Sequence, residues 1–488
     1  MVRPHAQLLA DYLAELRLEN LPPQARPLLQ ACLLDYLGCL LGGLGTPVAT
    51  VLHGFAAAFG PGICSVAGRV GRAPPEAAAL VNGAIAHALV FDDLHRHAKL
   101  HPGVAVIPAA LAAAEIAGAD GASLLLAIAA GYEAAARVGV ALGLASHRLK
   151  GWRAAGTAGS FGAAVAAARL WALDKAQMHH AIAAAAAQAS ANWAFRESGG
   201  MELYLAAGTA ARNGLVAALL ARSGFAGAAA PLEAADGGFL MLSSDAHDAA
   251  ELSDQLGTRF RLLDTCIKMH PTCHSTQTAL DAALILRERD APRLADIDRI
   301  EVRAGEITRL QCGWPYAPGP AAKLIFHMGY AIAVALRNGR VMPGDFEGAS
   351  PHDPELVRIA QSTEIIADPA LTAIYAERKP SEVTLILRDG TRLSERVEFC
   401  RGEPENPADA ATVAAKFRNL AGPRLAPSQL DRIAEIVLSI EAEKNVAELL
   451  GLLRMAATPG SASSPTVRAA GPRTYRHPPG HPVHTGAG

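Results

Sequence analysis

The sequence predicts a mainly α protein, a large all-helical domain with a smaller inserted α+β lid domain. Ala and Leu recur at helical spacing over residues 5–250, β-branched residues begin to alternate after about residue 290, and helical spacing returns after residue 402. The chain has 488 residues, of which 51% are hydrophobic and 18% are charged. It is therefore long and apolar enough to bury the cores of two domains.

The helices of the first half begin at recognisable residues and contain small residues that permit close packing. Pro22 and Pro23 suit the first turn of one helix, and Asp174 suits the residue that caps another. Between residues 106 and 139, Ala and Gly recur at short intervals, as they do where helices approach one another closely. We therefore expect a crowded bundle of helices.

The inserted segment is predicted to combine strands with a helix. Residues 297–307 and 381–399 carry β-branched residues in rough alternation, and the second run has an Asp-Gly pair at 389 and 390 that suits a hairpin turn. Between these runs, residues 323–339 predict a helix closed by an Asn-Gly C-cap. The segment from 266 to 402 is therefore predicted to be a small α+β domain.

These patterns divide the chain into three parts. Residues 1–265 plus 403–457 are predicted to form the helical domain, and residues 266–402 are predicted to form the lid. Residues 458–488 are dominated by Pro, Gly, Ser and Ala and have almost nothing to bury. That composition predicts a disordered tail.

Charge and composition argue against several classes of partner. The formal net charge of −2 gives no attraction to polyphosphate, so we expect no nucleic acid partner. The uncharged run at residues 36–68 is interrupted by Gly and Pro, so we expect no membrane span. Asp11 and Glu15 interrupt the apolar N-terminal pattern, where a secretion signal would exclude them, and seven scattered cysteines form no CxxC pair. We expect a cytoplasmic protein.

The densest polar cluster is FDDLHRHAKLHPG, at residues 91–103. Histidine titrates near neutrality and a neighbouring aspartate can orient its ring, so this cluster predicts proton transfer. The alternatives are a solvated polar loop and a metal site made by three histidines. Because no HExxH motif occurs, we expect no metal. With the histidine that precedes it, the cluster contains His87, Asp92, Asp93, His95, His97 and His101.

A second candidate is KMHPTCHSTQTALDAAL, at residues 268–284, where polar residues precede an amphipathic helix. The free N–H groups of that helix start can hold an anion, and Lys268 would fix a substrate carboxylate there. His270, Cys273 or His274 could then face the reacting carbons. The alternative is a capped loop with a buried cysteine.

The third candidate is KGWRAAGTAGSFGAAVAAA, at residues 150–168. Small residues lead into a helix whose start could bind a carboxylate, aided by Lys150 or Arg153. No GKS or GKT follows, no GxGxxG stands between a strand and a helix, and no GxSxG appears. What remains is acid–base chemistry without a cofactor.

Seven stretches, in this order, resemble the MmgE/PrpD family, which includes 2-methylcitrate dehydratase, cis-aconitate decarboxylase and iminodisuccinate epimerase. They cover about residues 5–457 and are LLDYLGCLLGG (33–43), NGAIAHALVFDD (82–93), HPGVAVIPAALAAAE (101–115), GTAGSFGAA (156–164), AAGTAARNGLVAALLARSGFAG (206–227), KMHPTCHSTQTALDAA (268–283) and GEPENPADAATVAAKF (402–417).

The resemblance implies a helical domain built from both chain ends, an inserted lid, a cleft between them, and a homodimer. It implies small di- or tricarboxylate substrates that are handled by basic residues without a metal or an organic cofactor. His101 and Lys268 match residues of the family's active site.

The chain departs from the family pattern at four positions. The family commonly has Thr where this chain has Leu94, His where it has Arg153, Lys near Leu203 and His at Gln277. The loss of a lysine and two histidines and the gain of an arginine must change either the charge pattern of the substrate or the proton-transfer step.

We therefore expect a cofactor-independent lyase of the dehydratase type. A base would remove a proton next to a carboxylate, cations would stabilise the enolate-like intermediate, and an acid would expel hydroxide as water. A decarboxylase, an epimerase or isomerase, and a non-catalytic protein that binds a carboxylate are the alternatives. The expected catalytic residues are His101 as acid or base, Asp93 as the neighbour that orients it or relays its proton, Lys268, His95 and His274. The expected substrate-binding residues are Arg153, Lys150, Asp92, His87 and Cys273.

Overall fold

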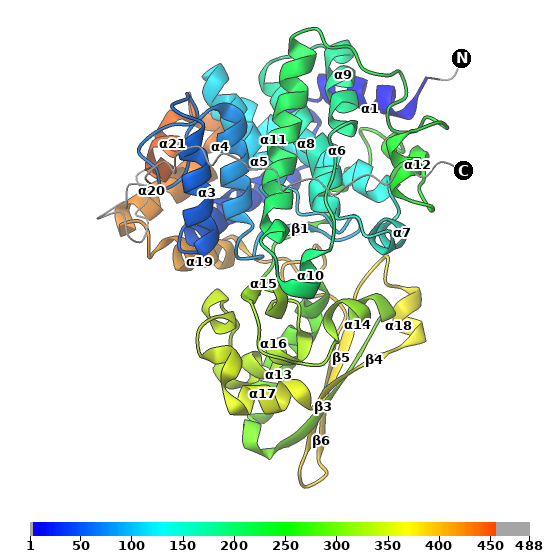
Figure 1. Cartoon of the computed structure of the whole chain (residues 1–488), viewed down its shortest axis with the longest axis vertical. Helices are drawn as coiled ribbons and strands as arrows, with labels where there is room; N and C mark the ends of the chain where they lie inside the picture. The colour runs from blue at the N-terminus through cyan, green and yellow to red at the C-terminus, as the bar shows by residue number, and fades with distance from the viewer. Residues whose placement is uncertain (1–2, 455–488) are drawn as a thin grey trace, which may run out of the picture.

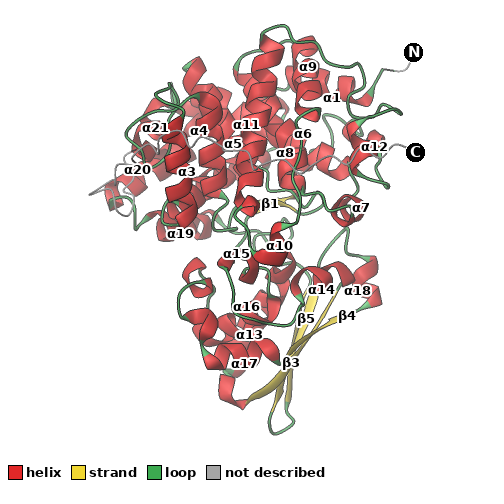
Figure 2. Cartoon of the chain, viewed as in Figure 1, coloured by secondary structure: helices red, strands yellow, loops and turns green. Residues whose placement is uncertain are grey.

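The computed structural model describes residues 3–454 of the chain. Figure 1 shows a larger body, coloured mostly blue to green and orange, above a smaller body coloured light green to yellow. Figure 2 shows helices throughout the larger body, whereas the long strands lie in the smaller one. Helix makes up 58% of the structure and strand 8%, which confirms the predicted fold class. The predicted tail at residues 458–488 lies outside the described residues.

The larger body is built from both ends of the chain. Its N-terminal helices are α1 (His5–Glu15), α2 (Ala25–Gly43), α3 (Pro47–Ala58), α4 (Pro75–Ala86), α5 (Gly103–Ala117), α6 (Gly121–Ala141), α7 (Leu144–Leu149), α8 (Ala154–Leu170), α9 (Lys175–Ala186), α10 (Phe195–Ser198), α11 (Glu202–Arg222) and α12 (Phe239–Ser243). Its C-terminal helices are α19 (Ala410–Ala421), α20 (Pro427–Leu438) and α21 (Ala447–Arg454). Helix α19 packs against α2, so the end of the chain completes the body that its beginning starts.

Helix α8 lies at the centre of the larger body, in contact with α5, α6, α9 and α11. Every residue from Ala154 to Ala168 is buried. A Cβ on Gly162 would lie 2.5 Å from the backbone oxygen of Gly131 in α6, so only glycine lets these two helices approach so closely. This contact confirms the predicted use of small residues for close packing.

Two of the predicted helix starts can be compared with the structure. Asp174 caps α9, because its side chain accepts a hydrogen bond from the N–H of Gln177 (2.8 Å), as predicted. Pro22 and Pro23, however, are not in the first helical turn. Helix α2 begins at Ala25, whose N–H donates to the carbonyl of Pro22 (2.9 Å), so the two prolines form the turn that precedes the helix.

Within residues 3–454, two helices, α6 and α11, are long and apolar enough to cross a membrane by length and composition alone. Helices α2 and α3 together would give a third span if the 90° bend between them is ignored. In the structure, the apolar windows of α6 and α11 are 89% and 67% buried within the protein. The absence of a membrane partner stays a prediction.

The smaller body holds a four-stranded sheet in the order β4-β3-β5-β6. Its strands are β3 (Ile297–Ala304), β4 (Thr363–Ala367), β5 (Ser381–Leu387) and β6 (Arg392–Val397). Strand β3 is parallel to β4 and antiparallel to β5, and β5 is antiparallel to β6. Gly390 has a φ of +88° in the turn between β5 and β6, which confirms the hairpin predicted from the Asp-Gly pair.

The helices of the smaller body are α13 (Gln277–Asp290), α14 (Glu306–Cys312), α15 (Ala321–Leu324), α16 (Met328–Asn338), α17 (Pro354–Gln361) and α18 (Pro369–Ala373). The single helix predicted over residues 323–339 is wrong, because the chain breaks between α15 and α16. The side chain of His327 accepts the N–H of Tyr330 (3.0 Å) and starts a new helix there. Gly339, with a φ of +66°, closes α16 as predicted.

A short two-stranded sheet lies in the loops that lead toward the smaller body. Strand β1 (Leu94–His95) follows α4, and it pairs antiparallel with β2 (Thr265–Cys266), which precedes α13. The pairing holds the polar cluster of residues 91–103 where the larger and smaller bodies meet, as the position of β1 in Figure 1 shows.

Candidate active site

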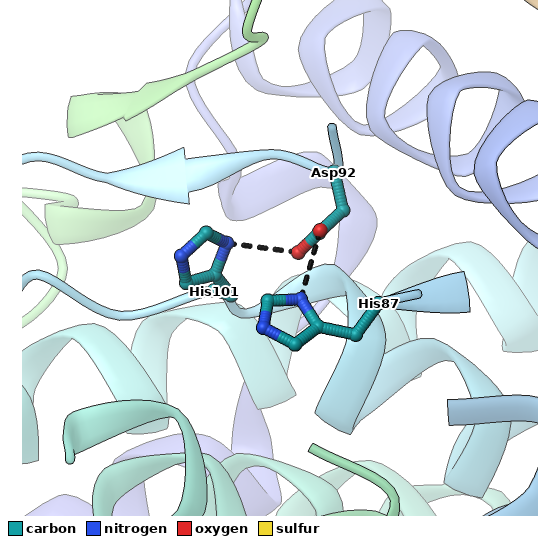
Figure 3. Close-up of side chains that lie close together, drawn as sticks. All are labelled: His87, Asp92 and His101. Atoms are coloured by element: carbon teal, nitrogen blue, oxygen red, sulfur yellow. Dashed lines mark hydrogen bonds and ion pairs between the residues drawn. The ribbon is translucent and has the colours of Figure 1, made fainter. Parts of the chain in front are cut away.

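Asp92 lies between two histidines that approach it from either end of the loop between α4 and α5 (Figure 3). His87, the residue that ends α4, has its Nδ1 2.9 Å from one carboxylate oxygen. His101, just before α5, has its Nδ1 2.8 Å from the other. Burial alone would raise the pKa of Asp92, but the two rings hold that pKa well below its usual range. Asp92 is therefore a carboxylate that accepts hydrogen bonds from both rings.

Arg153, at the start of α8, fixes the tautomer of His87. A guanidinium only donates hydrogen bonds, and its terminal nitrogen is 2.5 Å from Nε2 of His87. Nε2 must then be the acceptor, and the proton of the ring sits on Nδ1, which faces Asp92. Burial lowers the pKa of His87 to about 3, against the opposing effect of Asp92. His87 is a neutral ring that links Arg153 to the aspartate.

His101 differs from His87 in that its second ring nitrogen, Nε2, has no hydrogen-bond partner among residues 3–454. Its Nδ1–H donates to Asp92, which leaves the lone pair on Nε2. Burial lowers the pKa of His101 below its ordinary value, although Asp92 acts against that shift. At neutral pH the ring is therefore an oriented, uncharged base.

A cavity of about 40 Å³ lies where the two bodies meet, and His101 lines it. The larger body contributes Val90, Leu94, Lys99, His101, Arg153 and Trp193, and the smaller body contributes Cys273, His274, Ser275, Gln311 and Phe326. Larger hollows in the described part of the chain, of about 380, 530, 350 and 170 Å³, are lined by none of the three residues of the His87–Asp92–His101 group. The small cavity is therefore the candidate active site.

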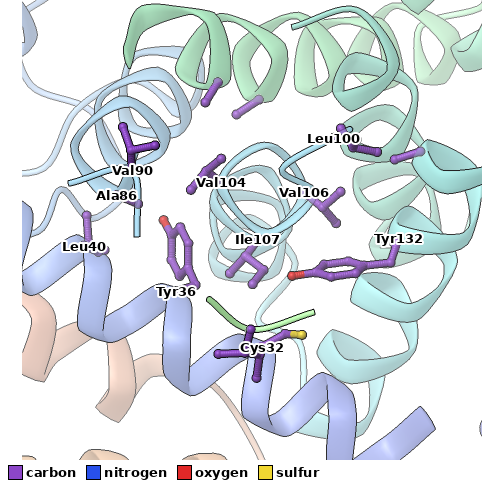
Figure 4. Close-up of a cluster of buried hydrophobic side chains, with 14 of the residues drawn as sticks. Cys32, Tyr36, Leu40, Ala86, Val90, Leu100, Val104, Val106, Ile107 and Tyr132 are labelled. Carbon is purple, nitrogen blue, oxygen red and sulfur yellow. The ribbon is translucent and has the colours of Figure 1, made fainter. Parts of the chain in front are cut away.

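Asp93 points away from this cavity, so the expected link between Asp93 and His101 is not what the structure shows. Its carboxylate accepts hydrogen bonds from the hydroxyl of Tyr132 (2.6 Å) and the N–H of Gly103 (2.9 Å). Figure 4 shows Tyr132 in a hydrophobic cluster near Cys32. Burial raises the pKa of Asp93 to about 7. Asp92, and not Asp93, is therefore the residue that orients His101.

Lys268 lies behind the cavity wall. Its ammonium donates to the backbone carbonyl of Val90, which does line the cavity. The backbone carbonyl of Lys268 in turn accepts from Lys416 (2.8 Å), which pairs with Asp35 at 2.5 Å. Burial lowers the pKa of Lys268. In this structure Lys268 supports the loop that carries Asp92, and it does not line the cavity.

Two other expected residues lie outside the cavity. His95 is fully buried with both ring nitrogens engaged, Nε2 with the carbonyl of Arg261 (2.8 Å) and Nδ1 with the N–H of Ala98 (3.1 Å). It fixes the loop and has no free nitrogen for a substrate. Lys150 pairs with Asp245 (2.7 Å) on the surface. We therefore leave both out of the proposed site.

Cys273 and His274 do line the cavity, at the start of the 3₁₀ turn that leads into α13. Burial lowers the pKa of His274 to about 4, although Glu403 lies 3.2 Å from its Nε2. The neighbouring thiol of Cys312 lowers the pKa of Cys273 below its ordinary value. The side chain of Gln277 is turned inward, where its Nε2 donates to the carbonyl of His270 (3.0 Å).

In the part of the chain that the structure describes, two groups of side chains have potential metal-ligand atoms within 4.8 Å of one another. They are His87, Asp92 and His101, and His274, Cys400 and Glu403. In the first group, the Nδ1 atoms of both histidines are hydrogen-bonded to the oxygens of Asp92, and the guanidinium of Arg153 contacts His87. In the second, the ammonium of Lys379 acts on Glu403. The positive charges next to both groups would repel a metal ion. The absence of a metal stays a prediction.

Three polar residues of the cavity wall were missed in the sequence. Lys99 belongs to the densest polar cluster, and that cluster was a signal for it. Ser275 lies within the second candidate segment. Gln311, near the end of α14, lies in no polar motif, and nothing in the sequence pattern singled it out.

The fold and the site define a two-domain helical protein in which a histidine–aspartate pair and a buried arginine meet in a cavity beside the lid. The chain belongs to the MmgE/PrpD family, because the model of the MmgE/PrpD N-terminal domain matches residues 7–251 and that of the MmgE/PrpD C-terminal domain matches residues 270–442.

Curated relatives have been named for two activities. A cis-aconitate decarboxylase-like protein of Aspergillus oryzae is 28% identical, over 91% of this chain and 96% of its own length. The cis-aconitate decarboxylase of Homo sapiens is 27% identical, over 88% and 91%. A 2-methylcitrate dehydratase-like protein of Aspergillus oryzae is 28% identical over 35% of this chain and 36% of its own length.

Proposed function

We propose that this protein is a cofactor-independent lyase that acts on a small tricarboxylate or dicarboxylate, with His101 transferring a proton at a carbon next to a carboxylate. The observation that carries the proposal is the Asp92–His101 pair, whose unpartnered Nε2 belongs to a ring lining the cavity that Arg153 also lines. The names of the relatives support the class of substrate.

In the dehydration reaction, Nε2 of His101 would remove a proton from the carbon next to a carboxylate. The electron pair moves toward that carboxylate, whose developing dianion is stabilised by Arg153. The C–O bond to the β-hydroxyl group then breaks, and the hydroxide takes the proton back from the His101 imidazolium to leave as water, which returns the ring to its neutral state. Asp92 holds the ring in the correct tautomer and stabilises the imidazolium that forms. This reaction starts from the neutral ring, which is the state that burial of His101 favours.

Decarboxylation is the second candidate, because relatives that match about nine tenths of this chain are named for it. There the bond to carbon dioxide breaks first, and a protonated His101 would deliver its proton to the resulting carbanion. The two reactions thus need opposite protonation states of one ring. Epimerisation would use the same abstraction with return of the proton to the other face.

The first test is proton NMR of the purified chain in deuterium oxide, with citrate, 2-methylcitrate, cis-aconitate, tartrate and aspartate as separate substrates. Exchange of a carbon-bound hydrogen or a new vinyl signal is expected with at least one tricarboxylate. His101→Ala should lower turnover by about 100-fold or more while circular dichroism stays native. No exchange and no product with any of these acids would contradict the proposal.

The proposals of a homodimer and of a cytoplasmic location rest on the sequence and on the family resemblance. Sedimentation of the purified chain would test the first, and fractionation of cells would test the second.

A further inference from the structure

Lys99 reaches the cavity from a short loop that is fixed at both ends. The backbones of His95 and Leu100 exchange two hydrogen bonds, of 2.7 and 3.4 Å, and so close the loop. Lys99 has a left-handed φ of +48°, which costs energy in a residue that carries a Cβ. The lid holds the loop as well, because Nζ of Lys379 donates to the carbonyl of Arg96 (3.0 Å). The ammonium of Lys99 is therefore positioned by the fold.

That ammonium is only partly used within the protein. It donates one hydrogen bond among the described residues, to Oε1 of Gln311 (3.2 Å), and it lies 4.5 Å from the centre of the Tyr375 ring. An ammonium has three N–H donors. Donors that are unmatched in a cavity wall are available to a ligand.

The contact with Lys99 also fixes the orientation of the Gln311 amide. Because an ammonium cannot accept a hydrogen bond, the atom it touches must be the amide oxygen, and the hydroxyl of Ser275 donates to the same oxygen (3.3 Å). Nε2 of Gln311 is then left over. It is buried without a hydrogen-bond partner among residues 3–454, in a side chain that lines the cavity and is only 3% exposed. A buried amide without an acceptor is destabilising unless a ligand supplies one.

We propose that Lys99 and Gln311 form a second carboxylate subsite on the lid side of the cavity, in addition to Arg153. The ammonium supplies charge and the amide N–H supplies a directed hydrogen bond. A carboxylate has lone pairs enough to accept from both. The ligand must then carry at least two carboxylates, one toward Arg153 and one toward the lid. This inference rests on the proposed function only in taking the ligand to be a small polycarboxylate.

The subsite makes ligand binding dependent on pH. Burial, together with the like charge of Lys379, lowers the pKa of Lys99 to about 7. A bound carboxylate favours the charged ammonium, so binding above pH 7 takes up a proton and affinity falls as the pH rises through that value. The other titratable groups that act on Lys99 are Arg148, Cys273 and Cys312.

The test is calorimetric titration of the full chain with tricarballylate, a saturated tricarboxylate that has no hydroxyl to lose, and with the monocarboxylate butyrate. Lys99→Met should weaken tricarballylate binding about 10- to 100-fold and Gln311→Leu should weaken it about 10-fold, because each substitution removes a hydrogen bond to a charged carboxylate. The matched control is Lys175→Met, which removes an exposed lysine paired with Glu15. Its affinity should stay within about twofold of the wild type.

Lys99→Arg tests the charge separately from the fold. Titrations at pH 8 in two buffers of different ionisation enthalpy should show proton uptake by the wild type. Lys99→Arg, which is charged throughout, should bind tricarballylate with less uptake than the wild type. Equal uptake by the two proteins would overturn the proposal even if Lys99→Met fails to fold.

The outcomes separate this subsite from the proposed reaction. Weaker binding by Lys99→Met, together with an NMR panel that shows no chemistry, would support the subsite and refute the lyase. Unchanged binding by Lys99→Met in an enzyme that turns over would refute the subsite alone. If the wild type does not bind tricarballylate at all, the subsite is wrong.

Discussion

The two walls of the cavity differ in how completely their polar groups are paired. On the wall of the larger body, Asp92 accepts from both histidines and Arg153 donates to His87. Nε2 of His101 is then the one ring nitrogen of the two histidines that has no partner among residues 3–454. On the lid wall, the Gln311 amide nitrogen has no partner among residues 3–454, and the Lys99 ammonium, which reaches that wall from the larger body, donates only one hydrogen bond there.

This difference separates two tasks within one cavity. A proton-transfer group must be held in one tautomer and one orientation before the substrate arrives, and complete pairing does this. A binding group must keep donors free until a ligand fills them. We therefore assign the chemistry to the His87–Asp92–His101 group of the larger body and the recognition of a distant carboxylate to the lid wall together with Lys99, which faces it.

Asp92→Asn should have the largest effect on the paired wall. The amide can accept from only one of the two rings, so His101 loses its fixed tautomer, and turnover should fall about 100-fold or more. Because the pair acts as a unit, the double variant with His101→Ala should be little worse than either single variant. Steady-state kinetics checks this, with circular dichroism as the control for folding. Multiplicative losses would show that the two residues act independently.

Arg153→Met should come next, with a fall of about 10- to 100-fold in kcat/KM, because a charge-assisted contact to the substrate is lost. Measuring KM and kcat separately shows whether Arg153 binds the substrate or only positions His87. A rise in KM means that Arg153 binds a carboxylate, whereas a fall in kcat alone would mean that it only positions His87. Arg153→Lys, which keeps the charge without the planar fork, is the matched variant.

The pH profile should assign one limb to His101 and the other to Lys99. For dehydration, kcat/KM should rise up to about tenfold per pH unit below the lowered pKa of His101, because only the neutral ring accepts a proton. It should fall again above about pH 7 as Lys99 loses its charge, and Lys99→Arg should remove that alkaline limb. For decarboxylation, where His101 must be protonated, the rate should decrease already as the pH rises through the pKa of His101. The profile therefore distinguishes the two reactions.

The sequence located the site better than it assigned roles within it. The cluster at residues 91–103 supplies Asp92, Lys99 and His101, because chemistry-bearing residues gathered in one loop are visible in a sequence. Which of two adjacent aspartates faces a histidine depends on the path of the loop, which has no periodicity to read. The same holds for His95, whose Nε2 is bound by the backbone carbonyl of Arg261, far away in sequence.

The lid wall was harder to predict for a different reason. Gln311 becomes a site residue only because α14 packs beside the turn that contains Ser275, a contact between distant segments of the chain. The two-body fold, in contrast, follows from local patterns: small residues for the crowded helices, and an Asp-Gly pair for the hairpin. Such patterns predict the local structure of residues that are close in sequence. They do not predict the lid wall, because its residues come from segments that are far apart in sequence.

Gly390→Ala should have the smallest effect, and it tests whether the lid acts only through its wall. Nothing lies within 4 Å of a Cβ placed there, so the cost is confined to a φ of +88° in a residue with a side chain, about 1–2 kcal/mol in the free energy of unfolding. Denaturant unfolding measures that loss. Turnover and tricarballylate affinity should not change, because the hairpin tip contributes no residue to the cavity lining. A loss of affinity would show that the whole sheet, and not only the wall at Gln311, governs how the lid meets its ligand.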